Sequence, residues 1–307
     1  MTATFEETHP GIASFLLITS GIIGLVINLW ILFKVIWQNA FGRSFGWIWV
    51  SRGIAYCCSS LCFVLVLGPV YYFFPEEIDV ELGVRFYAYH IALISTTLSI
   101  LSNLLIAANR CLLISIPFTY KEVFSERKTL VYIGITWILS AASVILPFWI
   151  PQCSDDLIEE NEIFYVEPTF QCAYVFQLSV FVAIWIAVVA TMIADFFAIY
   201  KLRKMSKVGQ VKKLLNHGIP DQRCPNEPER KRRFEAKPGT AIIVQSILNP
   251  ITMISLCLGS AIPDPFLKFL CLEFLWSTVD PVDGFVVIFF NENMRTFNSF
   301  QSHSVHT

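Results

Sequence analysis

The sequence predicts an all-α integral membrane protein, a seven-transmembrane helix bundle with its N-terminus outside and its C-terminus inside. Two observations predict this fold class. The chain of 307 residues is 55% hydrophobic and only 15% charged, with a mean hydropathy of +0.60, whereas soluble domains carry about 25% charged residues. The second is a series of apolar runs long enough to cross a bilayer core of about 30 Å, which needs about 20 helical residues.

The apolar runs define the spans in order along the chain. Continuous apolar runs of this length predict helices and not barrel strands, in which apolar and polar side chains would alternate. The seventh run is as apolar as the others but contains three acidic residues, Glu273, Asp280 and Asp283. The predicted spans cover residues 13–36, 48–74, 84–109, 130–150, 173–199, 239–263 and 266–290.

The distribution of Lys and Arg sets the predicted orientation. The segments after spans one, three and five hold most of the bases, and residues 201–238 alone carry twelve bases against four acids. The opposite segments are acidic, and the one after span four has six acids and no base. We therefore expect residues 1–300 to form one domain, with a basic cytoplasmic loop at 201–238, which attracts anionic lipid, and a short cytoplasmic tail at 291–307.

The predicted cytoplasmic end of span three carries the first candidate site. An Arg there either meets carbonyls and carboxylates or anchors the topology by reaching the lipid headgroups. Asn109, Arg110, Cys111, Pro117 and Tyr120 resemble the Asp-Arg-Tyr box of rhodopsin-like receptors and the Pro and Tyr that follow it. The resemblance implies that Arg110 engages a heterotrimeric G protein from a wet interface. Asn109 cannot form the ion pair of the family's Asp, so a hydrogen bond or another partner restrains Arg110 at rest.

Span seven carries the second candidate site, an intramembrane polar switch. Asp283 lies eight residues before Asn291, a spacing that resembles the Asn-Pro pair and Asn-x-x-Phe-Arg turn of rhodopsin-like receptors; Asp280 offers a competing register. The two acids are three residues apart and share a helix face. Acids at membrane depth face the bundle interior, but no matching base is apparent, so a purely structural pair is an equal alternative. Asn28 stands in span one, where these receptors carry an Asn.

The predicted outer side holds two further candidates. Glu273 lies seven residues after the start of span seven, about 10 Å down the helix, which is the depth of an outer ligand pocket; an acid hydrated by a water-filled vestibule is the alternative. Cys153 and Cys172 lie in the outer acidic loop, on the oxidising side, and are expected to form a disulfide because span three has no Cys at its outer end. No zinc-ligand spacing with His occurs, so no metal or cofactor is expected.

Five segments, taken in order, resemble the nematode serpentine chemoreceptors of class X, a divergent branch of rhodopsin-like receptors. They are "SFGWIWVSRGIA", "ANR" with "IPFTYKEVFS", "QCAY" leading to "ADFFAIYKLRKMSK", "VQSILNP" and "VDGFVVIFFNENMR". The resemblance implies a chemosensory G-protein-coupled receptor in the plasma membrane, at a sensory-neuron cilium. Its implied ligand is an extracellular small molecule and its implied partner a heterotrimeric G protein. The sequence departs from the rhodopsin-like pattern because span two lacks Asp and span six lacks Cys-Trp-x-Pro.

Other function classes fit the sequence less well. A small-molecule transporter would show inverted repeats and paired helix breaks, whereas Asn249-Pro250 is a break without a counterpart. A ligand-gated channel would carry current in a cell that lacks G-protein signalling. An enzyme is not expected, since no His-Glu-x-x-His or Gly-x-Ser-x-Gly motif occurs in any span. Nucleic-acid binding is not expected either, because the basic run at 229–233 lies between two spans.

Overall fold

The computed structural model describes residues 10–38, 41, 43–73, 82–146, 171–216, 244–248, 250–255, 257–259, 261–291 and 294. The regular structure of these residues is helical, and no strand occurs among them. By length and composition, five helices could cross a membrane: Gly11–Gln38, Ser44–Val70, Tyr87–Ser115, Glu126–Ile145 and Phe181–Met205. This is the architecture of a multi-pass helical membrane protein.

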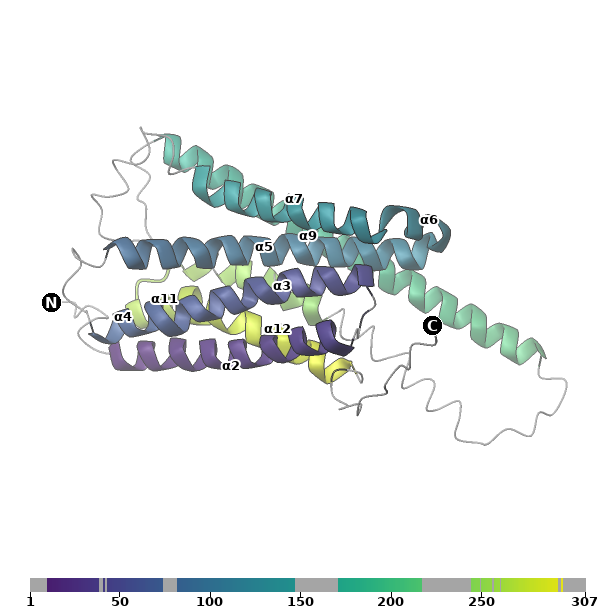
Figure 1. Cartoon of the computed structure of the whole chain (residues 1–307), viewed down its shortest axis with the longest axis horizontal. Helices are drawn as coiled ribbons and strands as arrows, with labels where there is room; N and C mark the ends of the chain where they lie inside the picture. The colour runs from purple at the N-terminus through teal and green to yellow at the C-terminus, as the bar shows by residue number, and fades with distance from the viewer. Residues whose placement is uncertain are drawn as a thin grey trace, which may run out of the picture.

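The helices follow one another along the chain with short connections where the structure describes them. Figure 1 shows the long helices lying side by side with their axes along one common direction. The elements are α2 (Pro10–Gln38), α3 (Arg43–Cys62), η1 (Phe63–Leu67), α4 (Gly68–Phe73), α5 (Leu82–Ser115), α6 (Pro117–Val123), α7 (Glu126–Ile145), α9 (Gln171–Asn216), α11 (Pro265–Phe269), η3 (Leu270–Phe274) and α12 (Leu275–Phe290).

Two helical segments accompany the five long helices. A shorter apolar helix runs over Val244–Gly259. The elements α11, η3 and α12 then follow one another without interruption. At 1.5 Å per residue, the run from residue 265 to residue 290 is about 39 Å long, which is enough to cross a bilayer core of about 30 Å. Both segments coincide with predicted spans.

Helix α9 extends further than the predicted fifth span. It ends at Asn216 and has 46 residues, so it is about 69 Å long, more than twice the thickness of a bilayer core. In Figure 1 it projects beyond the other helices. The first part of the predicted basic loop is therefore helical, because Lys, Arg and Leu favour helix and nothing requires the helix to stop where it leaves lipid.

The polarity of the bundle is the reverse of that of a soluble protein. Many large apolar side chains lie exposed on its outside, and five of them are 67% to 73% exposed: Phe15, Trp37, Leu65, Ile138 and Phe196. Charged side chains lie inside it and are at most 6% exposed, as are Arg52, Asp195, Asp280 and Asp283. Charged residues are almost never fully buried in soluble proteins unless they are paired. Apolar outer surfaces and interior charges are the arrangement expected when lipid is the solvent.

Where α12 packs, the interior of the bundle has three layers along its axis, and a further apolar cluster around Ile100, Val188 and Met253 lies between α5 and α9. One apolar cluster includes Phe63 and Trp276, and a second includes Trp49 and Val287. On α12 the buried acids lie between Trp276 of the first cluster and Val287 of the second. A polar layer therefore separates two apolar clusters. We call the end of the bundle near the second cluster the Arg110 end, since α5 ends there at Ser115, five residues after Arg110.

Candidate functional site

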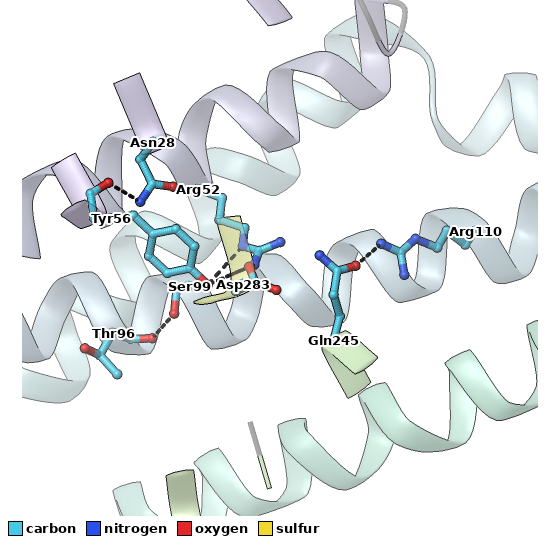
Figure 2. Close-up of polar contacts among 9 residues, drawn as sticks. Asn28, Arg52, Tyr56, Thr96, Ser99, Arg110, Gln245 and Asp283 are labelled. Atoms are coloured by element: carbon cyan, nitrogen blue, oxygen red, sulfur yellow. Dashed lines mark hydrogen bonds and ion pairs between the residues drawn. The ribbon is translucent and has the colours of Figure 1, made fainter. Parts of the chain in front are cut away.

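Arg110 lies near the end of α5, and its side chain turns into the bundle. Its Nη1 lies 3.5 Å from Asp195 Oδ1 on α9, and its Nη2 donates a 3.0 Å hydrogen bond to Gln245 Oε1. Ser246 completes the group, because its hydroxyl donates a 2.6 Å hydrogen bond to Asp195 Oδ2. Figure 2 shows the Arg110 and Gln245 side chains pointing toward each other. Arg110 thus ties α5 to α9 and to the 244–248 segment.

The Arg110 site is partly buried. The side chain of Arg110 is 17% exposed and that of Asp195 is 4% exposed, because α5 continues to Ser115 and α9 packs alongside it. The wet interface that the sequence predicts stays a prediction. A guanidinium that anchored the topology would reach out to the headgroups, whereas this one faces a carboxylate on a neighbouring helix. The sequence predicts that a hydrogen bond or another partner restrains Arg110 at rest. In the structure that partner is Asp195.

Asn109 contacts a different helix from the one that Arg110 faces. It is 2% exposed, and its Nδ2 donates a 3.3 Å hydrogen bond to the Tyr120 hydroxyl on α6. Pro117 stands at the first position of α6, where a backbone N–H is not needed. Cys111 is a half-buried free thiol. The predicted motif thus divides into Arg110, which faces α9, and an Asn109–Tyr120 contact that fixes α6 against α5.

A second buried arginine, Arg52 on α3, forms the polar layer's main contact with α12. It is 1% exposed and forms an ion pair with Asp283. Its Nε and Nη2 donate hydrogen bonds of 3.2 and 2.9 Å to the Tyr56 hydroxyl, which donates in turn to Asp283 Oδ2 at 3.3 Å. Its Cζ lies 4.8 Å from the ring centroid of Trp49. Figure 2 shows the guanidinium between Tyr56 and Asp283.

The ion pair corrects the interpretation of span seven. No base to match Asp280 and Asp283 is apparent within span seven, but Arg52 on α3 is the base that pairs with Asp283. Both acids are buried, as their shared helix face predicts. A base at membrane depth satisfies the acids inside the bundle. This leaves open whether the acids act in signalling or only in structure.

Helix α2 approaches α12 closely on the other side of the polar layer. Asn28 is 2% exposed, and its Nδ2 donates a 2.8 Å hydrogen bond to the Gly24 carbonyl (Figure 2). A Cβ on Gly284 would lie 2.6 Å from Ile27 Cγ2 on α2, and a Cβ on Gly24 would lie 3.4 Å from the Pro281 ring. Glycine is therefore required at position 284, because a larger residue there would force the two helices apart. At position 24 the tight contact is with α3, since the Cβ would lie 2.7 Å from Ser60 Oγ.

Glu273 lies at the opposite end of the bundle from Arg110. It is 9% exposed and sits in η3, a π-helical turn of the kind that is frequent at functional sites. Trp276, in the turn that follows, donates a 2.7 Å hydrogen bond to Thr96 and meets the rings of Phe63 and Tyr89 edge-on. The predicted ligand-pocket residue therefore lies beside an aromatic cluster.

Two other predicted features are Asn291 and the disulfide between Cys153 and Cys172. Asn291 is the residue at which α12 ends, and its N–H donates a 3.1 Å hydrogen bond to the Val287 carbonyl. Of the two cysteines of the predicted disulfide, Cys153 lies outside the described residues and Cys172 lies in the first turn of α9. That pairing therefore remains a prediction.

Sequence reasoning missed two residues that the structure places at the sites, Arg52 and Asp195. Each had a visible signal, because each is the one charged residue of its predicted span, 48–74 or 173–199, and such charges are functional candidates by default. Arg52 lies nine residues after the start of α3 at Arg43, and Asp195 lies six residues before Lys201 on α9. Both lie close to the end of a predicted span, where a charge is easily assigned to the flanking segment.

The fold and its buried polar sites define a multi-pass helical membrane protein. A family model described as "Serpentine type 7TM GPCR chemoreceptor Srx" matches residues 18–291, and the chain belongs to this family. It is also similar to Serpentine receptor class X 45 of Caenorhabditis elegans, at 21% identity over 93% of this chain and 80% of that protein. The resemblance to nematode class X chemoreceptors that the sequence predicts is therefore confirmed. The family is a class of receptors and not a family of enzymes.

Proposed function

We propose that the protein is a chemosensory G-protein-coupled receptor that binds an extracellular small molecule and activates a heterotrimeric G protein. Its place is the plasma membrane, at the cilium of a sensory neuron. The observation that carries the proposal is the Arg110 site, where a partly buried guanidinium holds side chains of two other helical segments at one end of the bundle. Family membership supports the same assignment.

The proposed receptor is one domain of seven spans with its N-terminus outside. The five long helices, the Val244–Gly259 helix and the run from residue 265 to residue 290 supply the spans. Arg203 and Lys204 are exposed at the Arg110 end, which makes that end the cytoplasmic one by the positive-inside rule. A reporter fused after Phe164 should be extracellular, and one after Asn226 cytoplasmic. Both reporters on one side of the membrane would contradict the seven-span topology.

The Arg110 site supplies the mechanism. At rest, Arg110 bridges α5, α9 and the 244–248 segment and keeps the cytoplasmic mouth of the bundle closed. A ligand shifts the population toward an arrangement in which these segments separate and Arg110 is free to meet an incoming helix of the G protein. Coupling requires that the two arrangements differ in how they hold this side chain. In this proposal the contact between Arg110 and Asp195 is present in the closed arrangement and absent in the open one.

The ligand, in this proposal, binds at the opposite end, beside Glu273. That end is extracellular in the proposed topology, and Glu273 lies next to the cluster around Trp276. Aromatic walls with a small number of polar groups are typical of small-molecule sites. Movement of α12 then carries the effect of binding toward the Arg110 end, since Glu273, Asp280 and Asp283 stand on one uninterrupted helical run.

The experiment that tests the proposal replaces Arg110 and measures recruitment of an engineered G protein at matched surface expression. Arg110→Ala should abolish recruitment driven by any odorant that activates the parent. Arg110→Lys should recover little, because a compact ammonium does not reproduce the planar guanidinium that reaches two partners. Arg127→Ala is the matched control, since Arg127 is an exposed base at the same end and its loss should leave recruitment unchanged. If Arg110→Ala behaves like this control, Arg110 only anchors the topology.

A further inference from the structure

One buried guanidinium faces two buried carboxylates in the polar layer. Arg52 pairs with Asp283, and Asp280, which precedes Asp283 on α12, is also buried at 6% exposure. The two acids are three residues apart, which is about 4.5 Å along the axis of α12, and they share a face. Arg52 therefore has two possible acceptors, one helical turn apart, and the ion pair in this structure is with Asp283.

The contacts that hold α12 in place differ between its two neighbours. Toward α2 it presents Pro281 and Gly284, which let the helices approach closely, and Ser277, whose hydroxyl lies 2.7 Å from that of Ser20. Toward α3 it is joined by the Arg52–Asp283 ion pair and by the Tyr56 hydroxyl. Among these contacts, the one between opposite charges is made by Arg52.

The pairing with Asp283 belongs to the same arrangement as the closed Arg110 site. Arg110 is held by Asp195 and Gln245 in the structure in which Arg52 holds Asp283. Release of Asp283 by Arg52 and release of Asp195 by Arg110 would therefore both mark a departure from this arrangement.

We propose that Arg52 is a positioning residue that holds α12 in its resting place through Asp283 and transfers its ion pair to Asp280 when the bundle opens. The inference rests on the proposed receptor function. An uncompensated charge at membrane depth is costly, so the guanidinium is held by one acid or by the other and not between them. Displacement of one packed helix past another by one turn is an established form of switching.

The test replaces each acid by its isosteric amide and measures ligand-independent recruitment of an engineered G protein at matched surface expression. Asp283→Asn removes the resting partner and should raise this recruitment about fivefold or more. Asp280→Asn removes the acid that pairs with Arg52 in the open arrangement and should lower this recruitment. It is measured in an Asp195→Asn background, where ligand-independent recruitment is expected to be high enough for a decrease to be detected. In an Arg52→Met receptor the two substitutions should no longer differ in sign. The proposal is overturned if the two substitutions change recruitment in the same direction while Arg52 is present. It is also overturned if they still change recruitment in opposite directions in the Arg52→Met receptor.

A readout without a G protein separates this proposal from the receptor function. The apparent unfolding temperature of the purified receptor should fall about 5 °C further for Asp283→Asn than for Asp280→Asn, because only the former breaks the resting pair. In the Arg52→Met receptor the two temperatures should coincide. If no variant recruits a G protein but this temperature difference appears and depends on Arg52, the receptor function fails and the resting Arg52–Asp283 restraint stands. Equal temperatures in the parent overturn the restraint.

Discussion

Asp195 is expected to restrain signalling, and Asp195→Asn is the substitution that tests it most cleanly. The amide has the shape of the carboxylate, so the hydrogen bond from Ser246, 2.6 Å long, still has an acceptor. What is lost is the negative charge 3.5 Å from the Arg110 guanidinium. The substitution therefore removes the attraction that holds α5 to α9 and leaves the packing of the two helices unchanged.

The size of the effect follows from the geometry of the pair. At 3.5 Å and an effective dielectric constant of about 20, two unit charges attract each other by about 4.7 kcal/mol. Desolvation of both groups offsets most of this attraction, which leaves a net contribution of roughly 1–2 kcal/mol to the closed arrangement. A factor of ten in an equilibrium constant corresponds to about 1.4 kcal/mol. Asp195→Asn should therefore raise the open fraction about 5- to 30-fold.

The assay is ligand-independent recruitment of an engineered G protein in cells, at matched surface expression. Ser246→Ala should raise recruitment less than Asp195→Asn does, because it removes one hydrogen bond to Asp195 and leaves the charge in place. Asp264→Asn is the control, since Asp264 caps α11 by accepting a hydrogen bond from the Leu267 N–H and Asn is an equally good cap. Recruitment by Asp195→Asn that equals the parent's would refute the restraint.

Three further predictions concern stability, the outer loop and the ligand. Gly284→Ala should destabilise the receptor by about 1–3 kcal/mol through overpacking, measured as a lower unfolding temperature, whereas Gly134→Ala should not, because nothing lies within 4 Å of a Cβ there. Non-reducing peptide mapping should recover Cys153 linked to Cys172, which closes a loop worth about 3 kcal/mol; two free thiols would reject the pairing. Glu273→Gln should weaken the response to an activating odorant, and an unchanged response to every such compound would leave Glu273 as a hydrated acid without a ligand role.

The helical membrane fold could be predicted because it depends on composition summed over many residues. A run of about 20 apolar residues has few alternatives to a transmembrane helix, and every described long helix lies on a predicted span. The helix ends could not be predicted from the same signal, because a helix continues past the bilayer surface when its residues favour helix. Asn216 at the end of α9 and Ser115 at the end of α5 illustrate this.

The candidate sites could be predicted only in part, because their partners come from distant parts of the chain. Arg110, Asp280 and Asp283 are visible as charges at or inside apolar runs. Their partners are not, since Arg52 and Asp283 are 231 positions apart and Arg110 and Asp195 are 85 apart. No local pattern links such pairs. The π-helical turn around Glu273 could not be predicted either, since it depends on packing against neighbouring helices.

Recruitment of an engineered G protein, measured against a panel of odorants in cells that express the parent receptor, tests the central proposal most directly. The same panel is applied to cells that lack heterotrimeric G proteins while membrane current is recorded. The account predicts odorant-dependent recruitment in the first cells, abolished by Arg110→Ala, and no odorant-dependent current in the second. Odorant-dependent current without G proteins, together with no recruitment by any compound, would contradict it and identify a ligand-gated channel.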